Sequence, residues 1–158
     1  MVENIESKKQ LSGIGGWLLL FILTRTIFGP PWNGWRLFQR WEEVRDAAPE
    51  YAAGTEFATL HNFSWSVFAL STAIQFCVGL LMWKRFKPSS VWIAIGSLWF
   101  CTLILAVGGH FVALSLVNAE FMPSDLKAFI VPLASAGIWS AYLLRSVRVQ
   151  NTYGLKAV

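Results

Sequence analysis

The stretch LSGIGGWLLLFILTRTIFGPP, residues 11–31, decides the fold class of this chain. It is almost entirely apolar from Ser12 to Phe28, and a helix over residues 12–28 is just long enough to cross about 30 Å of hydrocarbon. Gly29-Pro30-Pro31 is predicted to end that helix, because proline lacks a backbone N–H and disfavours helix before it. One charged residue, Arg25, lies inside the run. Its side chain either reaches water or has a role within the membrane.

Three longer apolar runs follow, at about 59–83, 91–117 and 125–145. Lipid offers no hydrogen bonds to the backbone, so runs of this length must be helical if they cross a membrane. The composition agrees, since 55% of the residues are hydrophobic and only 14% are charged. We therefore predict an all-α polytopic membrane protein, with residues 1–158 forming one domain built as a four-transmembrane-helix bundle.

The first run imitates a secretory signal peptide, because Lys8 and Lys9 precede its apolar residues. No small-x-small cleavage site follows around Thr24 or Gly29, so we expect the run to be retained as a span. The net charge of +4 comes from basic residues between the apolar runs, and they form no patch. This distribution predicts topology and gives no support to nucleic-acid binding.

The orientation follows from the positions of Lys and Arg. Placing both termini in the cytoplasm puts most basic residues there, including the Lys84–Lys87 cluster, while Arg36, Arg40, Arg45 and Lys127 fall outside. We predict a multi-pass protein of the bacterial inner membrane with cytoplasmic N- and C-termini.

The first outer loop contains a second kind of pattern. Within residues 34–47, apolar side chains recur every three residues at Trp35, Phe38, Trp41 and Val44, with charged residues between them. This spacing predicts a short amphipathic helix that either lies in the membrane interface or caps the bundle.

Ionisable residues within spans are candidates for function. Arg25 is expected to snorkel to the outer surface or to pair with a carboxylate at an outer span end, namely Glu56, Glu120 or Asp125. Arg145 and Arg148, at the cytoplasmic end, are candidates for contact with anionic lipid headgroups. His61 and His110, the only histidines, either form interhelical hydrogen bonds or bind a haem iron or another cofactor.

Small residues mark the last two spans, at Gly96, Gly108 and Gly109 in one and Ala136, Gly137 and Ser140 in the other. They predict close packing of these two helices, within one chain or across a dimer. Pro132 is expected to kink the fourth span. Cys77 and Cys101 are predicted to be buried free thiols, without metal-ligand spacing.

No span has a carboxylate near its middle, and the chain has no catalytic triad, phosphate-binding loop or zinc motif. We expect no catalytic site, no metal site and no resident cofactor. The leading interpretation is a non-enzymatic accessory or assembly protein of the bacterial cell envelope, with the lipid bilayer and either a membrane protein or a second copy as partner. Two alternatives stay open: a haem- or quinone-associated redox subunit using His61 and His110, and a lipid-handling or transport protein with Arg25 at an outer-leaflet cavity.

The two ends of the chain carry a resemblance. LSGIGGWLLL, residues 11–20, and YLLRSVRVQNTY, residues 142–153, are similar to the opening and closing stretches of the domain of unknown function 2569 family of bacterial inner-membrane proteins. The resemblance implies four membrane helices and supplies no catalytic or binding residue.

Overall fold

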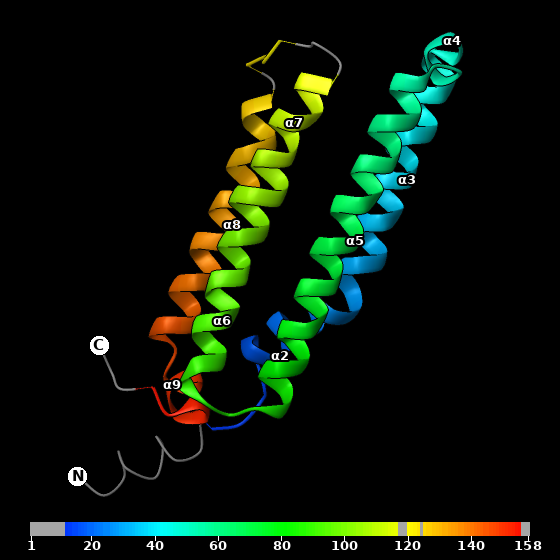
Figure 1. The fold of residues 1–158 in the computed structure, drawn as a ribbon. Coiled ribbons are helices and arrows are strands. Elements are labelled where there is room, and N and C mark those ends of the chain that lie inside the picture. Colours follow the sequence, from blue (N-terminus) through cyan, green and yellow to red (C-terminus); the bar gives the residue numbers. More distant parts are fainter. Residues whose placement is uncertain (1–11, 117–119, 124, 156–158) are drawn as a thin grey trace, which may run out of the picture.

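The computed structural model describes residues 12–116, 120–123 and 125–155, and the elements it describes are all helical. They form two helical hairpins (Figure 1). The first hairpin consists of α2 (Trp17–Leu23), the π-helix η1 (Thr24–Phe28), α3 (Gly29–Ala47), the short α4 (Pro49–Ala52) and α5 (Thr55–Lys84). The second consists of α6 (Pro88–Trp99), the π-helix η2 (Phe100–Gly108), α7 (Gly109–Leu116), α8 (Asp125–Arg145) and α9 (Val147–Tyr153).

The two hairpins share a core at one end of the molecule, and toward the other end α3 and α8 diverge while α5 still contacts α7 (Figure 1). At the end where α5 turns into α6, which we call the closed end, side chains from α2, α5, α6, α8 and α9 form one core. At the opposite end, called the open end, α3 and α5 stand apart from α8. Buried residues of the closed-end core are Leu18, Phe21, Ile22, Met82, Val91, Ala94, Leu98, Leu143, Val149 and Tyr153.

Polar contacts tie the two ends of the described chain together at the closed end. The Gly13 N–H donates to Thr152 Oγ1 at 2.9 Å, and Gly15 lies directly against the Arg148 guanidinium. The Tyr153 hydroxyl, whose side chain is fully buried, donates to the Met82 carbonyl oxygen at 2.8 Å. The stretches that opened and closed the family resemblance, residues 11–20 and 142–153, therefore contact each other in space.

The predicted helix stop at Gly29-Pro30-Pro31 is wrong. Helix continues from Trp17 to Ala47, and the change occurs in the hydrogen-bond pattern at η1, where the Gly29 N–H donates to the Thr24 carbonyl. The wider π-turn precedes the prolines, and Pro30 and Pro31 occupy the first turn of α3, where a missing N–H costs little. The helix predicted at 34–47 is thus the second half of α3, which runs beside α5 (Figure 1).

The other three helical boundaries agree closely with the predicted spans. Residues 59–83 lie in α5, residues 125–145 are α8, and residues 91–116 of the run at 91–117 lie within Pro88–Leu116, where nine residues of η2 are π-helical. Residue 117 lies outside the described residues. Two helices, Thr55–Lys84 and Pro88–Leu116, are long and apolar enough to cross a membrane among the residues described. A third candidate is the pair Phe129–Arg145 and Val147–Tyr153, which is bent by 64°.

The third and fourth predicted spans do pack on each other. Ala94 of α6 and Ala136 of α8 are almost fully buried, and the Trp99 indole N–H donates to Ser140 Oγ at 3.2 Å. Helix α8 continues through Pro132 to Arg145, and the sharp bend follows at its junction with α9. Ser124, which precedes α8 and whose side chain is of a type that caps helix N-termini, lies outside the described residues.

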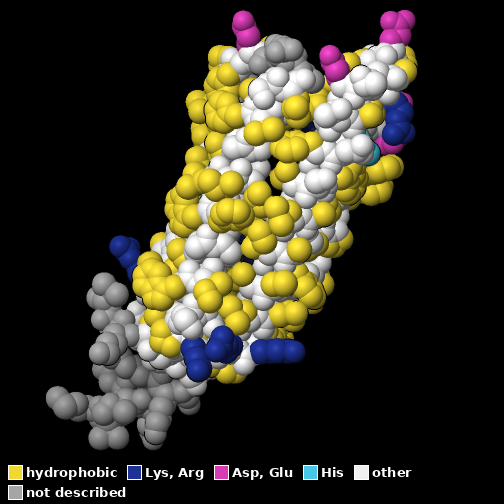
Figure 2. Space-filling view, in the orientation of Figure 1, with side chains coloured by type: hydrophobic (Ala, Val, Ile, Leu, Met, Phe, Trp, Pro, Cys, Tyr) yellow, Lys and Arg dark blue, Asp and Glu magenta, His cyan; other side chains and the backbone are white. Residues whose placement is uncertain are grey.

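The outer faces of the helices are apolar (Figure 2). Exposed large hydrophobic residues occur along every long helix, for example Trp92, Ile104, Val131 and Ile138. Basic side chains gather at the closed end, and acidic ones lie at the open end (Figure 2). One prediction fails on this surface: Cys77 is exposed on α5, although Cys101 is buried and both are free thiols. An apolar run surrounded by lipid has no need to bury every apolar side chain in protein.

Candidate functional site

A ladder of aromatic rings joins α3 and α5 near the open end. Phe57, His61, Trp65 and Phe68 follow one face of α5, at spacings of three or four residues. Trp41 of α3 packs edge-on against Phe57 and His61, with ring centroids 5.2 and 5.4 Å apart. Further along, Gly34 leaves room for the Phe68 ring, which would lie 3.1 Å from an added Cβ. The ladder explains why α3 stays on α5 after the hairpins have separated.

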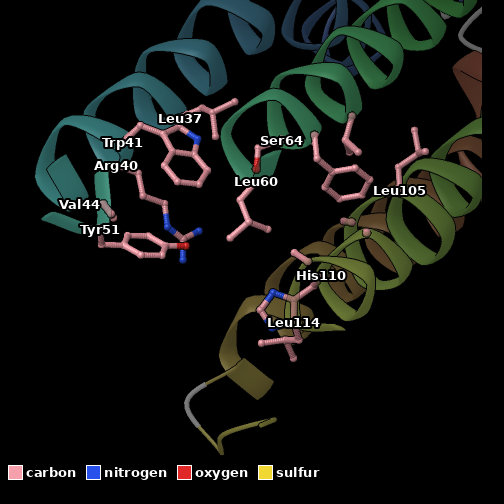
Figure 3. Close-up of a pocket in the computed structure, with 15 residues that line it drawn as sticks. Leu37, Arg40, Trp41, Val44, Tyr51, Leu60, Ser64, Leu105, His110 and Leu114 are labelled. Carbon is pink, nitrogen blue, oxygen red and sulfur yellow. The ribbon is translucent and has the colours of Figure 1, made fainter. Parts of the chain in front are cut away.

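Beside this ladder lies a cavity of about 570 Å³ between the two hairpins (Figure 3). Helices α3 and α5 form one side of it, and η2 and α7 form the other. We call it the inter-hairpin cavity. Its lining residues are Leu37, Arg40, Trp41, Val44, Tyr51, Leu60, Phe63, Ser64, Val67, Leu105, Ala106, Gly109, His110, Ala113 and Leu114.

The cavity is mostly apolar, and its polar groups converge at the open end. The Arg40 and Tyr51 side chains point toward the same part of the cavity (Figure 3). Within the part of the chain that the structure describes, the one ion pair joins Arg45 to Glu42, so Arg40 has no carboxylate partner there. The Trp41 indole nitrogen is buried and has no hydrogen-bond partner among these residues. An apolar cavity with a few convergent donors is typical of a small-molecule site.

The two histidines lie in different aromatic clusters. His61 Nε2 accepts a hydrogen bond from the Trp65 indole N–H at 3.0 Å, and its ring contacts Trp41 and Phe57. His110 lines the inter-hairpin cavity, and its ring packs edge-on against Phe129 of α8 at 5.2 Å. Each histidine is therefore a contact between two helices, and only His110 lines the cavity. No group of three or more His, Cys, Asp or Glu residues suited to a metal occurs among the described residues.

Arg25 lies in η1, nearer to the closed end than the cavity is. Its Nη1 donates to Gln75 Oε1 of α5 at 3.0 Å, and the guanidinium lies 5.8 Å from the centre of the Phe21 ring. The chain continues as helix for nineteen residues of α3 beyond η1, so Arg25 lies within a continuous helical path and not at its end. Its partner is an amide, not one of the predicted carboxylates. Glu56 and Glu120 are exposed, and the Asp125 side chain lies outside the described part of the structure.

Arg145 and Arg148 lie at the closed end. Arg145 is exposed at the last turn of α8, whereas Arg148 is partly buried against Gly15. Both remain predicted lipid contacts. The sequence did not mark Arg40 or Tyr51 as site residues, and it placed Trp41 only on the apolar face of a predicted helix.

The chain belongs to a family described as protein of unknown function (DUF2569), whose model matches residues 11–154. The resemblance of the two end motifs is thereby confirmed over nearly the whole chain. No curated protein and no solved structure matches it.

Proposed function

We propose that this member of the family is a non-enzymatic accessory protein of the bacterial inner membrane that holds an outer-leaflet phospholipid in the inter-hairpin cavity. The cavity itself carries the proposal, because its walls are apolar and its donors converge at one end. In this arrangement four helical segments cross the bilayer. The path Trp17–Ala47 supplies the first crossing, although η1 interrupts its α-helical pattern.

Charge distribution supports an orientation with the closed end in the cytoplasm. Lys84, Arg85 and Lys87 are exposed there, between α5 and α6, and no acidic residue lies among them. Such clusters favour the cytoplasmic side of a membrane. Both described chain ends then lie in the cytoplasm, and the open end reaches the outer leaflet.

The depth of the cavity matches a lipid headgroup and the start of its acyl chains. Ser64 precedes Lys84 by twenty residues of α5, which is about 30 Å at the helical rise and equals the hydrocarbon thickness. Arg40 and Tyr51 therefore lie near the outer headgroups. Leu105 and Val67 lie deeper, where acyl chains run.

The chemistry of the lining suits a phosphate followed by hydrocarbon. A guanidinium can donate two parallel hydrogen bonds to phosphate, and the Tyr51 hydroxyl can donate a third. The leucine and valine side chains of the walls match an acyl chain. Arg25 was the predicted anion contact at an outer-leaflet cavity, and the proposal gives that role to Arg40 instead because Arg40 lines the cavity.

Retained lipid tests the proposal. The protein is extracted in mild detergent from vesicles containing phosphatidylglycerol, and bound lipid is counted by native mass spectrometry. Wild type should retain one lipid, while Arg40→Gln should bind it about tenfold more weakly, as expected for loss of a charge-assisted hydrogen bond worth about 1.5–3 kcal/mol. Ala106→Phe, which fills the cavity, should displace the acyl chain.

Arg36→Gln is the matched control, because Arg36 is exposed on α3 one turn before Arg40 and does not line the cavity. Equal lipid retention by Arg36→Gln and Arg40→Gln would show that the cavity does not recognise the phosphate. If Ala106→Phe leaves lipid retention unchanged, the lipid does not bind in the cavity and the proposal is wrong.

A further inference from the structure

Arg25 is a cation inside the apolar part of the molecule. Arg25 does not line the inter-hairpin cavity. Its hydrogen bond to Gln75 and its position over the Phe21 ring place the guanidinium between η1 and α5.

The depth of Arg25 follows from its partner. Gln75 precedes Lys84 by nine residues of α5, which corresponds to about 14 Å along the helix. With Lys84 at the cytoplasmic edge of about 30 Å of hydrocarbon, the Arg25–Gln75 pair lies near the bilayer centre. A guanidinium at this depth is costly to hold without neutralisation, and such groups usually pair with an opposite charge.

The chain cannot supply that charge. All nine of its acidic residues lie at or before Glu56 or at or after Glu120, so none falls within α5, α6, η2 or α7 below the first turn of α5. A second copy has the same sequence and lacks the same group. Lipid phosphates lie at the bilayer surface, about half a hydrocarbon thickness away. A carboxylate held at this depth must therefore belong to another membrane-spanning helix.

The fold leaves a side from which such a helix can approach. Phe21 of α2 and Trp139 of α8 are in ring contact, with centroids 5.0 Å apart. This contact joins the two hairpins one helical turn from Arg25, on the side of the closed end. Above this contact α3 follows α5 and departs from α8 (Figure 1). Arg25 thus lies at the level where α3 begins to depart from α8, and its side chain is only partly buried.

We propose that Arg25, positioned by Gln75, binds the carboxylate of an Asp or Glu near the middle of a partner's transmembrane helix. The guanidinium has five N–H donors, of which Gln75 takes one, and a carboxylate can accept two in parallel. The partner is a different protein that lacks its own cation at this depth. This assignment does not depend on lipid binding in the inter-hairpin cavity.

Synthetic helices test the proposal without knowledge of the natural partner. The labelled protein is reconstituted in phosphatidylcholine vesicles with labelled Leu/Ala peptides of about 20 residues that carry either Asp or Asn at their centre. Energy transfer then reports association. Wild type should bind the Asp peptide about tenfold more tightly than the Asn peptide, as expected for one strong interhelical polar contact.

Three variants decide the assignment. Arg25→Gln should abolish the preference for the Asp peptide, Arg25→Lys should keep part of it, and Arg36→Gln should leave it unchanged. Arg25→Met, which keeps the volume of the side chain, replaces Arg25→Gln if that variant does not insert. Equal binding of the two peptides by wild type, or a preference that survives in both neutral variants, would overturn the proposal.

A second experiment measures lipid retention from vesicles that contain phosphatidylglycerol. If Arg25→Gln lowers retention of this lipid and leaves peptide binding unchanged, the site belongs to a lipid and the proposal is wrong. Self-association of the wild-type protein that is lost in Arg25→Gln would equally contradict it, because a second copy cannot contribute the carboxylate.

Discussion

The closed and open ends of this molecule hold their helices together in different ways. At the closed end, ten buried side chains from five helices form one core, and residues far apart in the sequence share it. At the open end, rings contact each other within a hairpin: Trp41 with Phe57 and His61 in the first, and His110 and Phe111 with Phe129 in the second. The difference separates a structural end from an end that can admit a ligand.

The same contrast appears in the polar groups. At the closed end the Tyr153 hydroxyl and the Ser90 hydroxyl donate to backbone carbonyls of Met82 and Arg85, both at 2.8 Å. At the open end the Trp41 indole nitrogen lacks a partner among the described residues, and Arg40 lacks a carboxylate there. Satisfied groups stabilise one arrangement, whereas available donors suit binding.

The largest effect is expected from a cavity in the closed-end core. Leu143→Ala should lower the free energy of unfolding by about 2–5 kcal/mol, because Leu143 is fully buried. Ile138→Ala, on the same helix, should have little effect because Ile138 is 68% exposed. Thermal unfolding in mild detergent measures both. Equal losses would mean that the closed end is not the stabilising core.

A smaller loss is expected where η1 approaches α5. Gly79→Val should cost about 1–3 kcal/mol, because even an added Cβ would overlap the Thr26 methyl group. Gly96→Ala is the control, since nothing lies within 4 Å of a Cβ at that position. The same unfolding measurement applies. If Gly79→Val unfolds like wild type, the close contact of the two segments does not exist.

Tyr153→Phe removes one hydrogen bond and leaves the core packing intact. We expect the free energy of unfolding to fall by about 1–3 kcal/mol, because the Met82 carbonyl loses a buried donor.

Arg148→Ala reports on the neighbouring contact with Gly15, and it should loosen the first residues of the described chain. Hydrogen exchange at residues 12–16 follows that change. Unaltered exchange would separate Arg148 from the attachment of the chain ends.

The smallest effect should come from the aromatic ladder of the open end. Trp65→Phe keeps a ring but removes the indole N–H that donates to His61, and should cost about 0.5–1.5 kcal/mol. Mobility of a spin label on α3 gives a second readout, which should rise in the variant. If Trp65→Phe lowered the free energy of unfolding as much as Leu143→Ala, the two ends would not differ in their contribution to stability.

Much of the helical pattern could be predicted from the sequence. Long apolar runs bounded by Lys84 and Arg145 identify both ends of α8 and the C-terminal end of α5 to within one residue, whereas α5 begins four residues before the predicted start at residue 59. The predicted contact of the last two spans exists, but Ala136 and Ser140 contribute to it, whereas a Cβ at Gly96 or Gly137 would meet nothing within 4 Å. These features depend on local composition, which the sequence states directly.

The helix prediction failed at a short sequence that is compatible with two structures. Gly29-Pro30-Pro31 reads as a helix end, yet a π-turn before the prolines lets the helix continue. That one error placed Arg25 at the end of a helix and α3 in a loop. The cavity residues Arg40 and Tyr51 were missed for the same reason, because their meeting with α7 requires α3 to lie on α5.

The sequence by itself determined that this chain is a helical membrane protein of its family, where most of its helices begin and end, and that no carboxylate lies within residues 57–119. Hydropathy and charge are additive along the chain, so they can be read without a structure. Three features are visible only in the folded chain: the hairpins share a core at one end while α3 and α8 diverge at the other, Arg25 meets Gln75, and Arg40 and His110 line one cavity. Those contacts join residues from separate helices, and side-chain packing rather than composition selects them.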